Sequence, residues 1–447
     1  MVYKKLLTSS RFTLKAQGRF ALDPRTKTLV IGRRDAASVD TVFIGKVLEQ
    51  SSSASLLDYN VAMDIGFPHV VGVFGSRGSG KSYDLGIILE GIFSADRGEV
   101  RDAAVVFDIQ DQFWTLGYSP KDELAVDQPQ LRELADWGLA AAEIPDVRVW
   151  VPRSSDSQVL NAHQFSLASA QLTYDDWLAI LDLERYSAMG QALLNLLRSS
   201  PNATPSELAE GCDAGGIVAN FQQGTVDALR WRLESLAATE IIGETGLSVD
   251  ALLEQGALTV ILMRNLADSV RGLIVGVVAR LVSDRMGRLQ QARKVAMRTG
   301  SVSTAEESLT GRVWLVLDEA HVLVPSDGAT AATAPLIDYV KRGRDAGLSL
   351  IFATQQPSAV NSKLMSQVDI TLTHMLGFEA DLSAAIARMP TRSSVEFDLD
   401  GQGRGSLADV IRSLAPGECV IADGASSRIF LAKVRPRMSA HGGATPK

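Results

Sequence analysis

Apolar residues form short, uninterrupted runs along much of the chain, and segments of helical periodicity lie between these runs. Strands that are apolar at every position and alternate with helices are typical of a parallel sheet covered on both faces. The pattern therefore predicts an α/β fold. The runs that predict its central strands all follow Pro68 and are HVVGVFG, AAVVFDI, ALTVILM, VWLVLDE, LSLIFAT and VDITLTHML.

Two stretches depart from this alternation. The N-terminal stretch has short β-type runs separated by polar turns, and it predicts a small β-rich, barrel-like module. A long central stretch has capping-box signals at Thr173 and Thr204 and leucines at helical spacing, which predict a helical insertion subdomain. We expect four parts: the N-terminal module at residues 1–65, the α/β core at 66–113 and 251–425, the helical insertion at 114–250 and a C-terminal tail at 426–447.

Charge and cysteine content narrow the class of protein. The 447-residue chain has 44 lysines and arginines against 52 aspartates and glutamates, which gives a net charge of −8. Such a chain does not have a surface that is basic all over, so contact with nucleic acid has to be confined to a local stripe, a loop or a pore. Cys212 and Cys419 have no metal-ligand spacing. They predict isolated buried thiols in a reducing, cytoplasmic compartment.

No segment has the pattern of a membrane anchor. The N-terminus lacks the long apolar run of a secretory signal. The longest apolar candidate, residues 258–282, is interrupted by Arg264, Asp268 and Arg271 and cannot cross a bilayer as one uncharged helix. We therefore expect a soluble protein.

The motif G-x-x-x-x-G-K-S follows the first central strand and leads into a helical run. Its glycines let backbone N–H groups turn inward to cradle phosphates, and the helix N-terminus adds a favourable partial charge. Lys81 is expected to reach the β- and γ-phosphates, and the Ser82 hydroxyl to ligate Mg²⁺. A glycine-rich turn matching by chance is a poor alternative in this context. The motif predicts a RecA-like P-loop NTPase core that binds ATP through Gly75, Ser76, Arg77, Gly78, Ser79, Gly80, Lys81, Ser82 and Tyr83.

A pair of carboxylates leaves the strand VWLVL. Asp318 at the end of this strand is expected to hold Mg²⁺, and Glu319 to act as the general base that polarises the attacking water. Adjacent carboxylates at the end of a buried strand are costly without a cation nearby, so a purely structural role is disfavoured. His321, in the same DEAH sequence, is expected to hydrogen-bond behind the catalytic pair rather than to react.

Two further polar groups are candidates for the reaction. Gln355 follows the strand LSLIFAT, where a side chain can sense the γ-phosphate or orient water, although a simple turn residue is the alternative. Arg344 and Arg342 lie on a helix that ends near Gly347, and either is a candidate arginine finger supplied to a neighbouring subunit. A solvated helix face is the alternative for these arginines.

The DEAH letters do not make the chain a two-domain helicase, because too few residues follow them for a second motor domain. A one-motor chain obtains the second wall of its ATP site from another copy of itself, which indicates a ring. Residues 66–442 resemble the HerA branch of the HerA–FtsK ATPases. The motifs that carry the resemblance are FGSRGSGKS, FDIQDQF, VLDEAHVLVP, KRGRDAGLSLIFATQQPS and the tail PGECVIADGASSRIFLAKVRPRMSAHGG.

The resemblance implies a homohexameric, Mg²⁺-dependent ATPase that pumps double-stranded DNA through a central pore. It also implies a partner, either a nuclease in DNA end resection or a nuclease or sirtuin-type effector in antiphage defence. The family's trans-acting arginine matches Arg344 rather than Arg342, and the family's glutamine matches Gln355. Arg264 and Arg271 are candidates for the DNA-contacting pore, with a salt bridge inside the core as the equal alternative.

Two other functions stay open at this stage. The ring is an assembly scaffold in one of them, so that ATP binding organises an effector without productive movement of DNA. In the other, the chain is a membrane-associated secretion or conjugation ATPase, which the missing transmembrane segment disfavours, whereas a soluble coupling ATPase of that kind stays open.

Overall fold

The structure is a computed structural model of the chain. It describes residues 11–12, 21–23, 25–33, 40–48, 50–51, 57–94, 102–153, 158–159, 161–213, 216–300, 310–390, 397–398 and 404–442.

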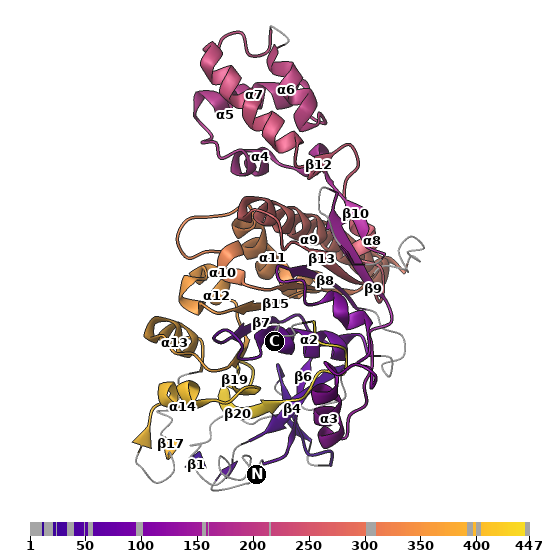
Figure 1. The fold of residues 1–447 in the computed structure, drawn as a ribbon, viewed down its shortest axis with the longest axis vertical. Coiled ribbons are helices and arrows are strands. Elements are labelled where there is room, and N and C mark those ends of the chain that lie inside the picture. The colour runs from indigo at the N-terminus through magenta and orange to yellow at the C-terminus, as the bar shows by residue number, and fades with distance from the viewer. Residues whose placement is uncertain are drawn as a thin grey trace.

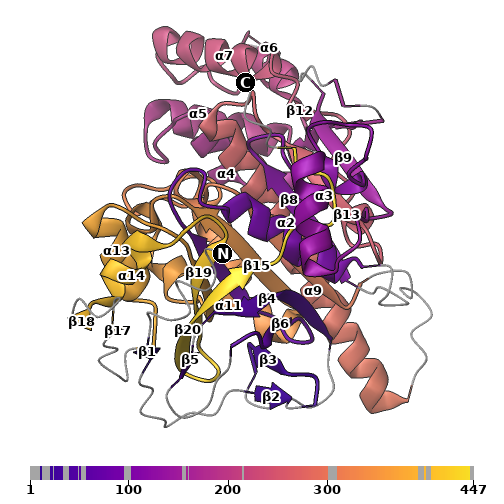
Figure 2. The ribbon, with the colours of Figure 1, turned by 60° about the horizontal axis from the view of Figure 1, so that its bottom comes forward.

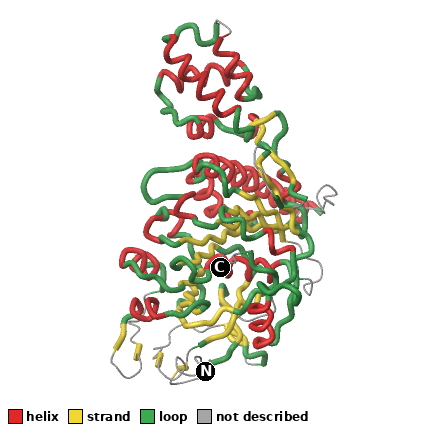
Figure 3. The backbone as a smooth tube through the Cα atoms, in the orientation of Figure 1, coloured by secondary structure: helices red, strands yellow, loops and turns green. Residues whose placement is uncertain are grey.

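A 14-stranded sheet runs through the body of the molecule (Figures 1 and 3). Its strand order is β10-β9-β13-β8-β14-β15-β7-β16-β19-β20-β4-β6-β3-β2. The strands, in this order, are β10 (His163–Phe165), β9 (Val147–Pro152), β13 (Leu258–Leu262), β8 (Asp102–Asp108), β14 (Arg312–Leu317), β15 (Leu348–Thr354), β7 (Val70–Phe74), β16 (Ile370–Thr373), β19 (Glu418–Asp423), β20 (Arg428–Val434), β4 (Thr41–Val47), β6 (Asn60–Asp64), β3 (Thr28–Ile31) and β2 (Ala21–Asp23).

The half of the sheet from β10 to β16 is entirely parallel. Strand β15 lies between β7 and β14, and Leu317 of β14 pairs with Phe107 of β8 on one side and Phe352 of β15 on the other. Every residue of β7, β8 and β15 is buried, as expected for strands covered on both faces. The predicted α/β core with a parallel sheet is therefore confirmed.

Alternate residues of the parallel strands face two different layers of helices. Val71 and Val73 pack in one hydrophobic cluster with α2, whereas Phe74 packs in the other with α9 and α11. Figure 2 shows α9 running diagonally across its face of the sheet. The helices around the core are α2 (Lys81–Ile92), α3 (Gln128–Trp137), α8 (Val249–Leu252), α9 (Asp268–Thr299), α10 (Ala320–Leu323), α11 (Thr333–Ala346), α12 (Ser362–Met365), α13 (Glu379–Ile386) and α14 (Leu407–Ser413), with short 3-10 turns η2 (Trp114–Gly117) and η4 (Pro357–Ala359).

The segment predicted as a helical insertion, residues 114–250, is helical only in part. Strands β9 and β10 lie within it and extend the core sheet beside β13, because the apolar run at 147–152 supplies an edge strand. Helix α3 precedes these strands and lies beside the core, whereas the helices after β11 (Leu167–Ala168) form a lobe that stands away from the sheet in Figure 1. This lobe contains η3 (Ser169–Gln171), α4 (Tyr174–Ile180), α5 (Ala188–Ser199), α6 (Pro205–Asp213), α7 (Gln223–Ala237) and β12 (Ile242–Gly243).

Two expectations about the lobe agree with the structure. The predicted capping box is formed at Thr173, whose hydroxyl accepts from the backbone N–H of Asp176. The leucines at helical spacing, Leu229 and Leu233, are fully buried between helices. An ion pair of 2.6 Å between Arg280 of α9 and Asp176 of α4 fastens the lobe to the core.

The N-terminal strands are continuous with the core sheet. β4 pairs with β20, and β6, β3 and β2 follow outward from it. The predicted tail thus contains a strand of the sheet. The sheet continues through the β4–β20 pair across the predicted division between residues 1–65 and the core, and the division into separate parts stays a prediction. Three short pairs among the described residues lie apart from this sheet: β1 (Arg11–Phe12) with β5 (Gln50–Ser51), β11 with β12, and β17 (Phe397–Asp398) with β18 (Arg404–Gly405).

The segment after β20 is fixed onto α2, the helix that begins in the P-loop motif. Arg435 donates to Glu90 at 2.8 Å, and the backbone N–H of Ser439 donates to the other oxygen of Glu90 at 2.8 Å. Arg437 is fully buried against Gly86, where an added Cβ would lie 2.9 Å from its guanidinium. A buried charge without its partner is strongly unfavourable, so these contacts bind the tail and α2 to each other.

Both cysteines, Cys212 and Cys419, are buried free thiols, as predicted. Within the described ranges, no helix is both long enough and apolar enough to cross a membrane.

His69 joins the N-terminal strands to the core. It precedes β7, its Nδ1 lies 2.8 Å from Asp369, which precedes β16, and its Nε2 lies 3.6 Å from Asp64 at the end of β6. Burial alone would lower the pKa of His69, but the hydrogen bonds and charges of Asp369 and Asp64 outweigh it and raise the pKa to about 9. The protonated imidazole is therefore the form that the fold stabilises.

We predict that His69→Gln destabilises the protein in a pH-dependent way. Because the folded pKa of His69 lies above its ordinary value of 6.5, its contribution is complete below that value and is lost as the pH rises through about 9. We expect His69→Gln to lower the free energy of unfolding by about 2 kcal/mol at the lower pH. This is less than the whole pKa change implies, because Asp369 is partly exposed. Denaturant unfolding of both proteins at about pH 6 and about pH 9.5 measures this. An equal difference at both pH values would contradict the prediction.

Candidate nucleotide-hydrolysis site

Four strand ends meet at one edge of the parallel sheet. The register places the residues that follow β7, β15, β14 and β8 side by side. These residues are Gly75 after β7, Gln355 after β15, the pair Asp318 and Glu319 after β14, and Asp108 at the end of β8. The P-loop, the predicted carboxylate pair and the predicted glutamine are thus brought together, in agreement with the sequence analysis.

The P-loop has the backbone conformation that its glycines permit. Gly78 and Gly80 have φ values of 75° and 117°, in the left-handed region that favours glycine, and α2 begins immediately after Gly80. At Gly75 an added Cβ would lie 2.3 Å from the Ser79 hydroxyl, so only glycine fits. The N-terminus of the 12-residue helix α2 therefore faces the loop and provides an anion-binding end.

The predicted nucleotide-binding residues have different surroundings. Lys81 is buried, and its ammonium donates to the carbonyl of Ser76 at 3.0 Å. The buried hydroxyl of Ser79 has no hydrogen-bond partner within the described ranges, and Arg77 is exposed. Tyr83 faces the tail instead, because its hydroxyl accepts from the backbone N–H of Arg437.

Three buried carboxylates crowd the same edge. Ser82 donates to Asp318 at 3.4 Å, so the two predicted Mg²⁺ ligands face each other. Burial, followed by the charges of Glu319 and Asp108, raises the pKa of Asp318 to about 7. Burial likewise raises the pKa of Asp108 to about 6, although backbone N–H groups of its own loop oppose the shift. The cluster holds more negative charge than its surroundings compensate.

Lys81 is the cation at this cluster. Burial lowers the pKa of its ammonium, and the charges of Glu319, Asp318 and Asp84 oppose that shift. One lysine does not balance three carboxylates, so the site fits a divalent cation. The oxygens of Ser82 and Asp318 are the kind of ligand that Mg²⁺ prefers, and phosphate and water complete such a site. Mg²⁺ bound here would neutralise the charge that develops on a phosphoryl group.

Glu319 is held in an unusual conformation. Its φ and ψ are both 52°, in the left-handed region, and its side chain is buried. One carboxylate oxygen, Oε1, accepts from the amides of Gln110 (3.2 Å) and Gln355. The other oxygen, Oε2, is buried without a hydrogen-bond partner within the described ranges. Oε2 therefore keeps the capacity to accept a further hydrogen bond.

His321 lies behind this pair, as the sequence analysis expects. Its Nδ1 is 3.1 Å from the hydroxyl of Thr354 and 3.5 Å from Oε2 of Glu319. It therefore links the end of β15 to the catalytic carboxylate.

Sequence reasoning missed three contributors to the site. Asp108 and Gln110 belong to the motif FDIQDQF, and their position at the end of a predicted parallel strand is a signal that marks them as neighbours of Asp318. His374 follows β16 and connects α2 with β19. Its Nε2 is 2.6 Å from Asp84 of α2, and its Nδ1 is 2.9 Å from the carbonyl of Glu418 of β19. Neither contact of His374 has a signal in the sequence.

Arg344 lies far from the phosphate-binding edge of its own chain. It occupies the last turn of α11, just before β15 begins, whereas the P-loop follows the other end of the parallel strand β7. Seven residues of β15 span about 20 Å, so Arg344 does not reach its own P-loop. Arg344 is exposed and has no hydrogen-bond or ion-pair partner among the described residues, whereas Arg342 is ion-paired with Asp284 at 3.0 Å.

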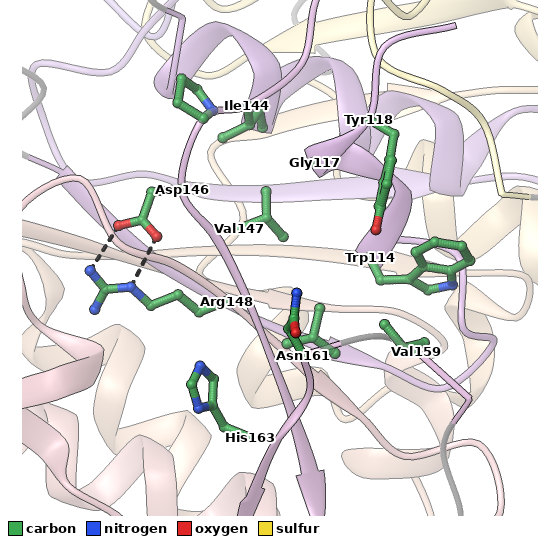
Figure 4. A pocket seen from close by; sticks show the side chains of 12 residues that line it. Trp114, Gly117, Tyr118, Ile144, Asp146, Val147, Arg148, Val159, Asn161 and His163 are labelled. Carbon is green, nitrogen blue, oxygen red and sulfur yellow. Dashed lines mark hydrogen bonds and ion pairs between the residues drawn. The ribbon is translucent and has the colours of Figure 1, made fainter. Parts of the chain in front are cut away.

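A pocket of about 430 Å³ lies outside this site, between η2 and the edge strands. Figure 4 shows Trp114 and Tyr118 on one side of it and the ion pair of Asp146 with Arg148 on the other. No residue predicted to bind nucleotide lines it.

The fold and the site define a P-loop nucleoside triphosphatase in which β15 separates the P-loop strand β7 from β14, the strand that Asp318 and Glu319 follow. The family described as "Helicase HerA, central domain" matches residues 42–282, which is more than half of the chain. The chain belongs to this family and is a HerA-type ATP hydrolase. No curated protein sequence matches it.

Two solved structures with the same fold are VirB4 and the plasmid coupling protein TrwB. VirB4 of Thermoanaerobacter pseudethanolicus aligns with a TM-score of 0.54 and 17% identity, over 90% of this chain and 97% of that chain. The plasmid coupling protein TrwB in complex with ADP and Mg²⁺ aligns with a TM-score of 0.52 and 14% identity, over 84% and 86% of the two chains. At these identities the likeness establishes the fold.

We predict that Lys81→Ala and Glu319→Gln abolish ATP turnover in different ways. Lys81→Ala removes the ammonium from the phosphate site and should weaken nucleotide binding. Glu319→Gln removes the base but keeps the site's shape, so it should bind ATP and hydrolyse it about a hundredfold to ten-thousandfold more slowly. Equilibrium binding of a fluorescent ATP analogue and single-turnover hydrolysis separate the two. Loss of nucleotide binding in Glu319→Gln would contradict the role of Glu319 as base.

Proposed function

We propose that the chain forms a homohexameric ring that uses Mg²⁺-dependent ATP hydrolysis to translocate double-stranded DNA through its centre. The observation that carries this proposal is the position of Arg344 at the edge of the sheet opposite to its own P-loop. The chain has a P-loop, a base and a metal ligand, but its candidate arginine finger is directed elsewhere. A neighbouring copy supplies the missing cation in a head-to-tail arrangement, and such contacts close into a ring.

Each chemical role is assigned to a residue of this site. Lys81 and the P-loop N–H groups bind the phosphates, and Ser82 and Asp318 hold Mg²⁺. Glu319 accepts a proton from the attacking water, Gln355 orients Glu319 and that water, and Arg344 of the neighbouring subunit stabilises the charge of the transition state. Membership of the HerA family supports the choice of duplex DNA as the moved substrate.

The two candidate pore arginines differ in the structure. Arg271 is tied into its own loop, since it donates to the carbonyls of Met263 (3.0 Å) and Arg264 (2.6 Å) and to Asp268 (2.7 Å). The side chain of Arg264 is 65% exposed, and its one ion pair among the described residues is a long one with Asp111, at 3.8 Å. We therefore assign Arg264 to the DNA path and a structural role to Arg271. One or a few exposed cations per subunit are sufficient for phosphate contact around a ring.

We also propose that the ring works with a nuclease or a sirtuin-type effector, in DNA end resection or in antiphage defence, in the cytoplasm. The resemblance of the motifs to HerA proteins supports this part of the proposal.

Displacement of a third strand tests the motor directly. A duplex motor strips a triplex-forming oligonucleotide from linear duplex DNA when ATP and Mg²⁺ are present, and Glu319→Gln provides the matched inactive control. We expect displacement with the wild-type protein alone or with its partner. Absence of displacement in both conditions, with ATP hydrolysis intact, would favour the alternative of an ATP-dependent assembly scaffold.

Mixed rings test the shared ATP site. Arg344→Ala and Glu319→Gln chains should each be inactive alone, because each site in the ring lacks either its finger or its base. Mixing them under conditions of subunit exchange should restore part of the ATP turnover, since some interfaces then combine an intact finger with an intact base. The parallel mixture of Arg342→Ala with Glu319→Gln is the control, in which Arg342→Ala alone should keep its activity. Absence of rescue despite proven exchange would contradict a trans-acting Arg344.

A further inference from the structure

The loop between β8 and η2, residues 109–113, holds the catalytic base from the side opposite to Gln355. Gln110 and Gln355 follow the two strands that flank β14, and both donate to the same oxygen of Glu319. The base is thus restrained from both sides through one oxygen. Gln355 already has a proposed role in orienting the attacking water. Gln110 lies on a different loop and has no role assigned so far.

The amide of Gln110 is fixed in one orientation. Gln112 donates to the Oε1 of Gln110 at 2.9 Å, so the amide nitrogen of Gln110 has to face Glu319. The root of the loop is fixed as well, because Asp108 accepts from the backbone N–H groups of Gln110 (3.1 Å) and Phe113 (2.8 Å). Gln110 itself is exposed, and its contact with Glu319 can break without disturbing the core.

Hydrogen bonds from two amides to one oxygen fix the direction of the Glu319 side chain. Loss of the bond from Gln110 leaves the bond from Gln355 in place and frees Glu319 to turn toward the attacking water. A contact of this kind is worth about 0.5–1.5 kcal/mol, which is roughly a twofold to tenfold change in rate.

The next residue of the same loop contacts the proposed DNA path. Asp111 has a φ of 56°, in the left-handed region, and pairs with Arg264 at 3.8 Å. The side chains of Asp111 and Arg264 are 30% and 65% exposed. A long, exposed ion pair contributes little to stability, so a DNA phosphate competes with it readily.

We propose that loop 109–113 couples DNA contact to ATP hydrolysis. Without DNA, the pair of Arg264 with Asp111 holds the loop so that Gln110 restrains Glu319. A DNA phosphate that binds Arg264 releases Asp111, the loop relaxes, and Gln110 releases the base. Gln110 is a positioning residue in this scheme, and the inference rests on the proposed function for its DNA contact.

The test measures steady-state ATP turnover by the full-length protein with and without saturating linear, blunt-ended duplex DNA. Gln110→Ala should raise the DNA-free kcat roughly threefold to tenfold with little change in KM for ATP. The ratio of turnover with DNA to turnover without DNA should fall toward one, because the restraint that DNA removes is already absent. Arg264→Ala should change both quantities in the same direction. Gln112→Ala should do so more weakly, because it only loosens the orientation of Gln110.

Arg185→Ala is the matched control. Arg185 is also a partly exposed arginine that is ion-paired with an aspartate, Asp175, but it lies in the helical lobe. Its variant should keep the wild-type turnover and stimulation. A thermal unfolding midpoint within the wild-type range for Gln110→Ala shows that the change in kcat is not a folding effect.

The outcomes separate this inference from the proposed function. If the wild-type protein displaces a triplex but Gln110→Ala keeps the wild-type basal rate and stimulation ratio, or loses activity in both conditions, the coupling is wrong and the motor stands. If the wild-type protein shows neither triplex displacement nor stimulation by DNA, the proposed function fails and the coupling with it.

Discussion

The site depends on the burial of three carboxylates around one lysine. Asp108, Asp318 and Glu319 meet because two neighbouring parallel strands, β8 and β14, end in register at one edge of the sheet. Burial and mutual repulsion raise the pKa of Asp318 to about 7, so the site is electrostatically incomplete without a further cation. Mg²⁺ supplies the missing positive charge. The phosphates of the nucleotide supply the anion that the P-loop and Lys81 require.

The remaining features of the core follow from that edge. Strand β15 lies between the P-loop strand and β14. Gln355, which follows β15, therefore lies beside Glu319, whereas Arg344, which precedes β15, lies at the other end of this strand. In the proposed ring, the same strand order places Gln355 beside the base within one chain, and the transition-state cation comes from a neighbouring chain. The buried contacts of Glu90 with the tail and of His374 with Asp84 fix α2 and the P-loop from behind. These contacts explain why a short segment after β20 belongs to the nucleotide-binding unit.

The sequence predicts the parts of the site that local pattern determines. The P-loop, the Asp318–Glu319 pair and Gln355 each follow an apolar strand, and parallel strands bring such positions together. Asp108 and Gln110 have the same strand-end signal, but their place beside Glu319 depends on β8 pairing with β14, and β8 lies more than 200 residues earlier in the chain. Edge strands β9 and β10 escape prediction because the helical signals around them are stronger than their short apolar runs. The pairing of β20 with β4 joins the two ends of the chain, and no local pattern specifies it.

Unfolding in the presence of ADP, with and without Mg²⁺, tests the central electrostatic claim most directly. At about pH 8, free Asp318→Asn should be more stable than the free wild-type protein, because it removes a buried charge that Lys81 does not balance. Saturating Mg²⁺ should add about 3 kcal/mol to the stability of the ADP-bound wild-type protein and much less to that of Asp318→Asn. A free Asp318→Asn protein that is less stable than wild type, yet keeps the full gain from Mg²⁺, would contradict the account.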